Sequence, residues 1–273
     1  MISEVRESRL RGRGLAFEEL RQYAQGDDVR TIDWKATARL RKPHVRVYAE
    51  ERERPVLLVV DQRSPMFFGS RRAMKSVTAA EVAALGAWRT LQSGDRPGAV
   101  IFNEAEIVEL RPHRSQTGVL RLLHEIAAKN QQLASDSPPS GGIGLNDALH
   151  AAARLARHDH LVILVSDLDG ADDETRRLAT KLVAHNDVLV VATYDPLGAT
   201  LQGRPGMHAS DRGTTWELPD TPAFAERFRH CFEELLSHWV DTFRALRVPV
   251  LPMSTAEPVA TQLRRLFGQQ RHP

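Results

Sequence analysis

The chain has 273 residues, 26% of them charged, and its 37 lysines and arginines nearly balance its 35 aspartates and glutamates. This length allows one or two domains with a sizeable core, and a formal net charge of +2 gives no bulk electrostatic reason for nucleic-acid binding. The single cysteine, Cys231, excludes an intramolecular disulfide and a cysteine-based zinc cluster.

Cys231 stands among apolar residues at helical spacing, so we expect a buried small side chain there and not a nucleophile. No apolar run approaches the roughly 20 residues of a membrane-spanning helix, and the first residues lack the apolar core of a signal peptide. We therefore expect a soluble, cytoplasmic protein without a membrane span.

The composition and hydrophobic pattern of the chain change near Pro55. Residues 1–54 are rich in charge, and the alternation in His44–Tyr48 predicts a half-exposed strand. After it, Val56–Val60 is a continuous apolar run, which is typical of a parallel strand buried on both faces. The sequence therefore predicts a segment 1–54 and a larger domain 55–273.

The larger domain alternates apolar runs with amphipathic stretches. Leu161–Val165 and Val188–Ala192 resemble the first apolar run, and residues 99–102 and 106–110 predict a hairpin. Amphipathic helices are expected at 74–91, 115–129, 144–157, 172–185, 222–246 and 256–267, and a second hairpin at 207–218. This order predicts an α/β fold: a doubly wound, mostly parallel sheet with one antiparallel edge strand, plus a small N-terminal β-containing appendage.

One stretch of the N-terminal segment, Gly26–Arg39, reads GDDVRTIDWKATAR. With the flanking Arg9–Leu15, Phe17–Arg21 and Tyr23, it resembles the domain-of-unknown-function 58 family. The chain contains no Gly-x-Ser-x-Gly elbow, Walker loop, His-Glu-x-x-His or Gly-x-Gly-x-x-Gly after a strand. The sequence therefore contains no motif that would support a hydrolase, NTPase or dehydrogenase function.

Within this stretch we expect a turn at Gly26–Asp28, a pairing of Asp33 with Arg30 or Arg39, and a buried ring for Trp34. The stretch is then either a structure that closes an edge of the sheet or a surface that recognises a partner, and the residues leave both open. The candidate partner-binding residues are Asp27, Asp28, Arg30, Asp33, Trp34 and Arg39.

The family resemblance also implies a domain similar to von Willebrand factor A. The metal-ion-dependent adhesion site of such domains uses Asp-x-Ser-x-Ser after the first strand, a threonine from a later loop and an aspartate after the fourth strand. Asp61 and Asp167 each follow a buried strand, so we expect both at the carboxyl edge of the sheet. Arg63 and Pro65 stand where the serines belong, and Ile143 stands where the threonine belongs.

The hydroxyl ligands that a hard cation such as Mg²⁺ uses are therefore missing, while Asp61, Asp167 and nearby Asp169 remain. Two close carboxylates repel unless a positive group lies between them. We expect no metal, and we expect the Arg63 guanidinium to replace the cation by bidentate pairing. The simpler alternative is that the aspartates only orient loops.

These observations favour a non-enzymatic protein-interaction or adaptor module that has no cofactor and does not bind nucleic acid. The resemblance implies a partner, because such proteins are commonly linked with MoxR-type AAA+ ATPases in chaperone-like or assembly systems. Two alternatives stay open: a divalent-metal-dependent ligand-binding domain, and a hydrolase with Asp61 and Asp167 as acid and base.

Overall fold

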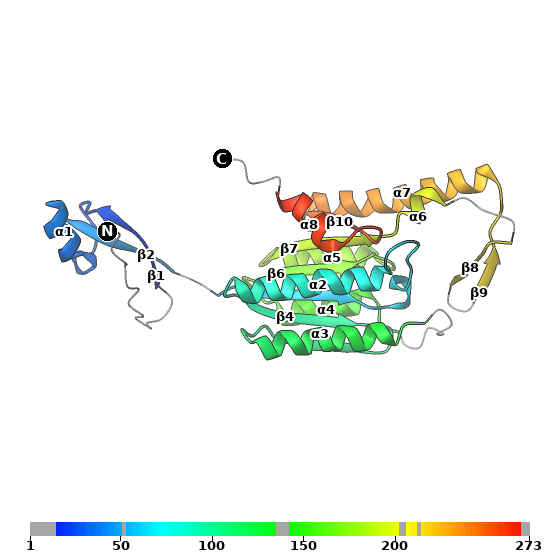
Figure 1. The fold of residues 1–273 in the computed structure, drawn as a ribbon, viewed down its shortest axis with the longest axis horizontal. Helices are drawn as coiled ribbons and strands as arrows, with labels where there is room; N and C mark the ends of the chain where they lie inside the picture. Colours follow the sequence, from blue (N-terminus) through cyan, green and yellow to red (C-terminus); the bar gives the residue numbers. More distant parts are fainter. Residues whose placement is uncertain (1–14, 51–52, 135–141, 202–205, 212–213, 269–273) are drawn as a thin grey trace, which may run out of the picture. The chain divides into compact units, whose positions relative to one another are not determined.

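The computed structural model describes residues 15–50, 53–134, 142–201, 206–211 and 214–268 (Figure 1). The chain divides into two compact units, Met1–Glu53 and Arg54–Pro273. This division lies next to the boundary that the sequence places between residues 54 and 55.

The N-terminal unit is built on an antiparallel pair of strands, β1 (Leu15–Gln22) and β2 (His44–Glu50). A single turn of 3-10 helix, η1 (Val29–Thr31), and the helix α1 (Trp34–Leu40) connect the two strands. The strand predicted from the alternation at 44–48 is confirmed, and the family stretch forms the connection between the strands.

The larger unit contains a six-stranded sheet in the spatial order β10-β7-β6-β3-β4-β5. Its strands are β3 (Pro55–Asp61), β4 (Arg96–Phe102), β5 (Ile107–Leu110), β6 (Leu161–Ser166), β7 (Asp187–Tyr194) and β10 (Val250–Ser254). β5 pairs antiparallel with β4, and the other neighbours pair in parallel. The chain starts in the middle of the sheet, runs to one edge and then returns to fill the other edge, so the predicted doubly wound fold is confirmed.

Helices cover both faces of this sheet (Figure 1). They are α2 (Lys75–Gln92), α3 (Gln116–Gln131), α4 (Leu145–Leu155), α5 (Asp173–Val183), α7 (Pro222–Ala245) and α8 (Val259–Gly268), with the short η2 (Ser64–Met66) and α6 (Leu197–Thr200). Alternate side chains of β3 point to opposite faces of the sheet and belong to two hydrophobic cores. Leu57 and Val59 pack with α4, α5 and α7, whereas Leu58 and Val60 pack with α2, α3 and α8. The continuous apolar run is explained by this two-sided burial.

The expected hairpins and helices are present, with two differences. β8 (His208–Asp211) and β9 (Thr214–Glu217) pair antiparallel, as predicted, but β10 was not foreseen. The prediction that Cys231 is buried is wrong, because its side chain is exposed on α7. α7 contributes Trp239 and Phe243, from its C-terminal half, to the core cluster, and Cys231 lies in the half that extends past this contact.

None of the described helices combines the length and the apolar character that crossing a lipid bilayer requires.

The tight packing at Gly98 in β4 gives a test of the sheet. A Cβ atom there would lie 2.6 Å from the backbone nitrogen of Pro112 and 2.7 Å from the carbonyl oxygen of Leu110. Gly98→Ala should lower the free energy of unfolding by about 1–3 kcal/mol. In the control Gly118→Ala, the new Cβ would lie 3.6 Å from the Cβ of Ser115, and an alanine in a helix should raise stability by about 0.5–1 kcal/mol. Urea denaturation of both variants measures the difference, and equal effects would contradict the close approach.

Candidate functional site

The two aspartates that the sequence singled out lie at the point where the strand order reverses. Asp61 ends β3, and Asp167 follows the last residue of β6. β3 and β6 are parallel neighbours in the middle of the sheet, with Val60 opposite Val165. Their carboxyl ends therefore bring Asp61 and Asp167 to the same edge, where doubly wound proteins commonly bind ligands.

Asp61 forms a buried bidentate ion pair with Arg63. Asp61 is 0% exposed and Arg63 is 6% exposed. The Nε of Arg63 donates to Oδ1 of Asp61 at 3.0 Å, and its Nη2 donates to Oδ2 at 2.6 Å. The backbone N–H of Arg63 adds a third hydrogen bond to Oδ1 at 3.0 Å, and the hydroxyl of Ser166 donates to Oδ2 at 2.7 Å. Both carboxylate oxygens therefore already accept two hydrogen bonds each.

The guanidinium of Arg63 is itself held from two further sides. It lies over the ring of Phe102, 5.4 Å from the ring centroid, which is a favourable cation–π distance. Its Nη2 also donates to the backbone carbonyl of Asp169 at 3.0 Å. Asp169, which the sequence placed near Asp61 and Asp167, therefore contacts Arg63 through its main-chain carbonyl. Arg63 in this way connects the ends of β3 and β6 with the turn that follows β6.

Asp167 has a cation of its own. The Nζ of Lys75, the first residue of α2, pairs with Oδ2 of Asp167 at 2.5 Å, and Oδ1 accepts the N–H of Asp169 at 3.0 Å. No ion pair joins Arg63 to Asp167 within the described residues. The expected bidentate pairing of Arg63 is present, but it is made with Asp61, while Lys75 pairs with Asp167 from the neighbouring helix.

Burial and pairing act against each other on the ionisation of this pair. Burial raises the pKa of the Asp61 carboxyl, and the charge of Asp167 adds to that rise, while the hydrogen bonds from Arg63 and Ser166 oppose it. Burial lowers the pKa of Arg63, but the hydrogen bonds and charge of Asp61, with the charges of Asp167 and Asp169, raise it above its ordinary value. Arg63 therefore stays charged and keeps a counter-ion beside Asp61.

The residues present do not fit a divalent cation. Pro65 lies in η2, and the side chain of Ile143 packs against the core. The side chains of proline and isoleucine contain no oxygen, so neither residue can supply a side-chain ligand. Cationic groups already occupy the positions beside Asp61 and Asp167. No group of three or more His, Cys, Asp or Glu side chains in the described part of the chain is arranged to hold a metal.

The simpler alternative, in which the aspartates orient loops, is also supported by the contacts. Asp61 accepts the backbone N–H of Arg63 two residues later, and Asp167 accepts that of Asp169 in the same way. Such local bonds shape the turns after the strands. Loop orientation and charge pairing thus occur together at this edge.

A third carboxylate, Asp195, follows β7 at the same edge, and no role in the site was predicted for it from the sequence. It is 3% exposed and accepts hydrogen bonds from the N–H of Ser70 at 2.8 Å, the hydroxyl of Ser70 at 2.5 Å, the N–H of Leu197 at 2.9 Å and the hydroxyl of Thr255. Burial raises the pKa of Asp195, but these hydrogen bonds bring it below its ordinary value. Asp195 therefore ties the loop before α2 to β7 and to the residue that follows β10.

The only signal for Asp195 in the sequence is its place after an apolar run, the same signal that identified Asp61 and Asp167. The contacts of Ser166 and Lys75 with these aspartates were not predicted. Ser166 could have been found from its hydroxyl next to Asp167, whereas Lys75 has no local pattern that marks it.

In the N-terminal unit, the three candidate aspartates form internal hydrogen bonds. Asp27 pairs with Arg21 at 2.8 Å and accepts the N–H of Ala24 at 2.8 Å. Asp28 caps η1 by accepting the N–H of Arg30 at 2.9 Å. These contacts shape the turn that the sequence predicted at Gly26–Asp28.

Asp33 caps α1 by accepting the N–H groups of Lys35 and Ala36, each at 2.9 Å. It also pairs with Arg46 of β2 at 2.8 Å, so the expected pairing with Arg30 or Arg39 is wrong. The amide of Ala36 and the guanidinium of Arg46 hold the pKa of Asp33 below its ordinary value. The helix start and the second strand are therefore joined through one carboxylate.

Trp34 departs most from expectation. The sequence predicts a buried ring, but Trp34 is 70% exposed. It is the first residue of α1, directly after the cap, and the buried residue of that helix is Ala36. The ring is turned outward because the short helix meets the strand pair through Ala36.

The strand order and the antiparallel edge strand define a doubly wound α/β domain. Residues 19–237 match the family described as "Protein of unknown function DUF58", and the chain belongs to this family. An uncharacterized protein of Mycobacterium tuberculosis is 28% identical over 263 residues, covering 95% of this chain and 81% of that protein.

Solved structures similar in fold include the pilus adhesin SpaC from Lactobacillus rhamnosus GG, with a TM-score of 0.43, 11% identity, and coverage of 79% of this chain and 30% of that chain. A von Willebrand factor type A protein from Catenulispora acidiphila has a TM-score of 0.36, 13% identity, and coverage of 71% of this chain and 44% of that chain. The fold class follows from the strand order itself.

The donor set at the carboxyl edge predicts no metal binding. Titration with Mg²⁺ or Mn²⁺ should give no saturable heat and no shift in melting temperature, because a ligand that binds only the folded state would raise it. Saturable binding in the millimolar range or tighter, abolished by Asp167→Asn, would overturn this expectation.

Removal of Arg63 should leave the Asp61 charge buried without its main partner. Arg63→Ala is therefore expected to lower the free energy of unfolding by about 3–5 kcal/mol, and Asp61→Asn on that background should recover part of the loss. The control is Arg72→Ala at the more exposed Arg72–Glu81 pair, which should cost about 1 kcal/mol or less. Additive effects in the Asp61–Arg63 double-mutant cycle would show that the two groups do not interact.

Proposed function

We propose that this chain is a non-enzymatic adaptor that binds a protein partner through the surface around Trp34. The observation that carries this proposal is the 70% exposure of that tryptophan within the family stretch. Tryptophan and arginine are the side chains that most often dominate the binding energy of protein interfaces. An exposed tryptophan does little for the stability of its own unit, so a partner is the better explanation for it.

The N-terminal unit exposes other apolar side chains besides Trp34. Val29 is 61% exposed, Leu40 47% and Leu20 36%. A pocket of about 430 Å³, lined by Leu20, Asp33, Lys35, Ala36, Ala38 and Arg39, opens on the same unit. Exposed apolar side chains beside a pocket and flexible cations suit a protein surface of opposite charge.

The contacts separate the six candidate residues into two groups. Asp27, Asp28 and Asp33 hold the turn, η1 and α1 in shape. Arg30 and Arg39 are exposed, and within the described residues neither forms an ion pair. The aspartates are therefore positioning residues, and Arg30, Trp34 and Arg39 are the residues that would meet a partner.

Family resemblance supports a MoxR-type AAA+ ATPase as the partner. The absence of catalytic motifs from the sequence and the saturated hydrogen bonds of buried Asp61 support a non-enzymatic role. Both oxygens of Asp61 are engaged by Arg63 and Ser166, which disfavours its use as an acid or base in hydrolysis.

Binding of the full chain to a purified MoxR-type AAA+ ATPase of the same organism, with and without ATP, tests this function. Trp34→Ala and the double variant Arg30→Glu/Arg39→Glu should each weaken binding by about tenfold or more, since interface tryptophans and arginines each commonly contribute more than 1 kcal/mol. Because the ring of Trp34 is exposed, its removal should leave circular dichroism and melting temperature unchanged.

Arg121→Glu/Arg264→Glu, two charge reversals on exposed helical positions of the larger unit, is the matched control and should bind as the unaltered chain does. Asp33→Ala serves as the reference for a distorted N-terminal unit, because it removes the α1 cap and the Arg46 pair. If Trp34→Ala and the Arg30/Arg39 reversals bind the ATPase as well as the control does, this surface is not the interface.

A further inference from the structure

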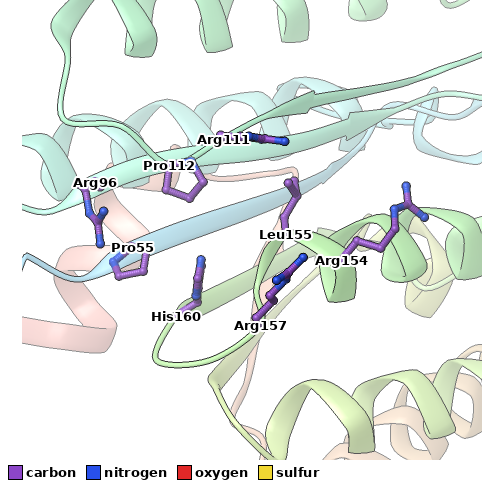
Figure 2. A pocket seen from close by; sticks show the side chains of 8 residues that line it. All are labelled: Pro55, Arg96, Arg111, Pro112, Arg154, Leu155, Arg157 and His160. Atoms are coloured by element: carbon purple, nitrogen blue, oxygen red, sulfur yellow. The ribbon is translucent and has the colours of Figure 1, made fainter.

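A second pocket lies at the amino ends of the strands, at the edge of the sheet opposite Asp61. Pro55 and Arg96 are the first residues of β3 and β4 and are paired in register, and His160 immediately precedes β6. Arg111 and Pro112 follow β5, which runs antiparallel and so ends at this edge. The pocket has a volume of about 390 Å³ (Figure 2).

The lining of this pocket, called the arginine pocket below, is cationic. The described residues that line it are Pro55, Arg96, Arg111, Pro112, Arg154, Leu155, Arg157 and His160, and none of these is an aspartate or glutamate. Arg154 pairs with Glu109 at 2.6 Å, but within the described residues Arg111 and Arg157 form no ion pair. Like charges gathered around one hollow repel each other, and an anion would relieve that repulsion.

A neighbouring pocket at the same edge of the sheet differs from the arginine pocket, because it contains acidic as well as basic side chains. It has a volume of about 480 Å³ and contains Arg54 together with Asp159 and Asp187. Arg54 pairs with Asp187. The charge of Arg54 in that pocket is balanced by a carboxylate of the chain, whereas Arg111 and Arg157 of the arginine pocket have no such partner within the described residues.

The loop that carries Arg157 and His160 is fixed by a buried asparagine. The side chain of Asn186 accepts the N–H of His160 at 3.0 Å and donates to the carbonyl oxygens of Ala156 at 3.1 Å and Leu182 at 3.0 Å. Figure 2 shows Arg157 and His160 pointing from this loop toward the strands. The backbone under two of the pocket's basic side chains is thus held in place before any ligand arrives, which reduces the entropy cost of binding.

His160 has a defined orientation as well. Its Nδ1 donates to the carbonyl oxygen of His158 at 2.7 Å, because a carbonyl can only accept. The proton on Nδ1 is therefore engaged within the loop. This leaves Nε2 available to a ligand.

We propose that this arginine pocket binds a small phosphate-bearing molecule. The planar guanidinium group matches phosphate oxygens through two parallel hydrogen bonds and stays charged at all physiological pH values. The pocket volume lies in the range of small-molecule sites. Pro55, Pro112 and Leu155 add an apolar wall that would accept the non-phosphate part of the ligand.

Isothermal titration of the full chain with inorganic pyrophosphate and with ADP, at about 0.15 M NaCl, tests this proposal. Pyrophosphate should give saturable binding that the double variant Arg111→Gln/Arg157→Gln weakens by about tenfold or more. The charge-matched control Arg121→Gln/Arg264→Gln alters exposed arginines on α3 and α8 and should change the affinity by less than about twofold.

The two probes distinguish the source of the phosphate group. Tighter binding of ADP than of pyrophosphate would identify a nucleotide-type ligand that uses the apolar wall, and equal binding would identify recognition of phosphate alone. The proposal is overturned if neither probe saturates, or if both arginine variants weaken binding equally. It is also overturned if a hexaglutamate peptide binds while pyrophosphate does not, since the pocket would then serve an acidic protein segment.

Discussion

The carboxyl edge of the sheet depends on the buried ion pair between Asp61 and Arg63. Neither charge would be stable in this position alone, because removing an isolated ion from water costs several kcal/mol even after the protein relaxes. The pair therefore constrains everything that touches it. Ser166 at the end of β6, the ring of Phe102 at the end of β4 and the carbonyl oxygen of Asp169 each contact it at hydrogen-bond or cation–π distance.

The two edges of the sheet differ in how their charged side chains are paired. At the carboxyl edge, Asp61, Asp167 and Asp195 are each satisfied by a cation or by hydroxyl and amide donors. At the amino edge, the arginine pocket presents cations with few carboxylates of the chain to meet them. The edge at which doubly wound proteins commonly bind ligands is thus closed by the chain's own side chains. The opposite edge is the one with the capacity to attract an anion.

Local patterns in the sequence were enough to predict most of the fold. Apolar runs followed by aspartates predicted β3, β6 and β7, and their parallel arrangement placed Asp61 beside Asp167. β10 was missed because Pro252 interrupts its apolar pattern, yet β10 is an edge strand, where a proline does not remove a needed ladder bond. Cys231 was misjudged because helical spacing reveals an apolar stripe but not how far the helix extends past the core.

Contacts between residues far apart in the sequence could not be predicted in the same way. Lys75 meets Asp167 across 92 residues, and Ser70 meets Asp195 across 125. No periodicity encodes such pairings, because they depend on where a helix start is placed over the sheet. The exposure of Trp34 was missed for a related reason, since tryptophan is usually well buried and the short α1 offers only Ala36 to the strand pair.

The N-terminal unit shows how such an exposed ring can persist. Among residues 20–46, the buried apolar side chains are Ala36 and Val45, so apolar packing contributes little to the stability of this stretch. Its aspartates supply local order instead, by capping η1 and α1 and by pairing with Arg21 and Arg46. These caps and pairs hold the backbone of η1 and α1 while Val29, Trp34 and Leu40 stay on the surface. The exposed apolar side chains that remain, Trp34 first among them, are those through which the proposed partner would bind.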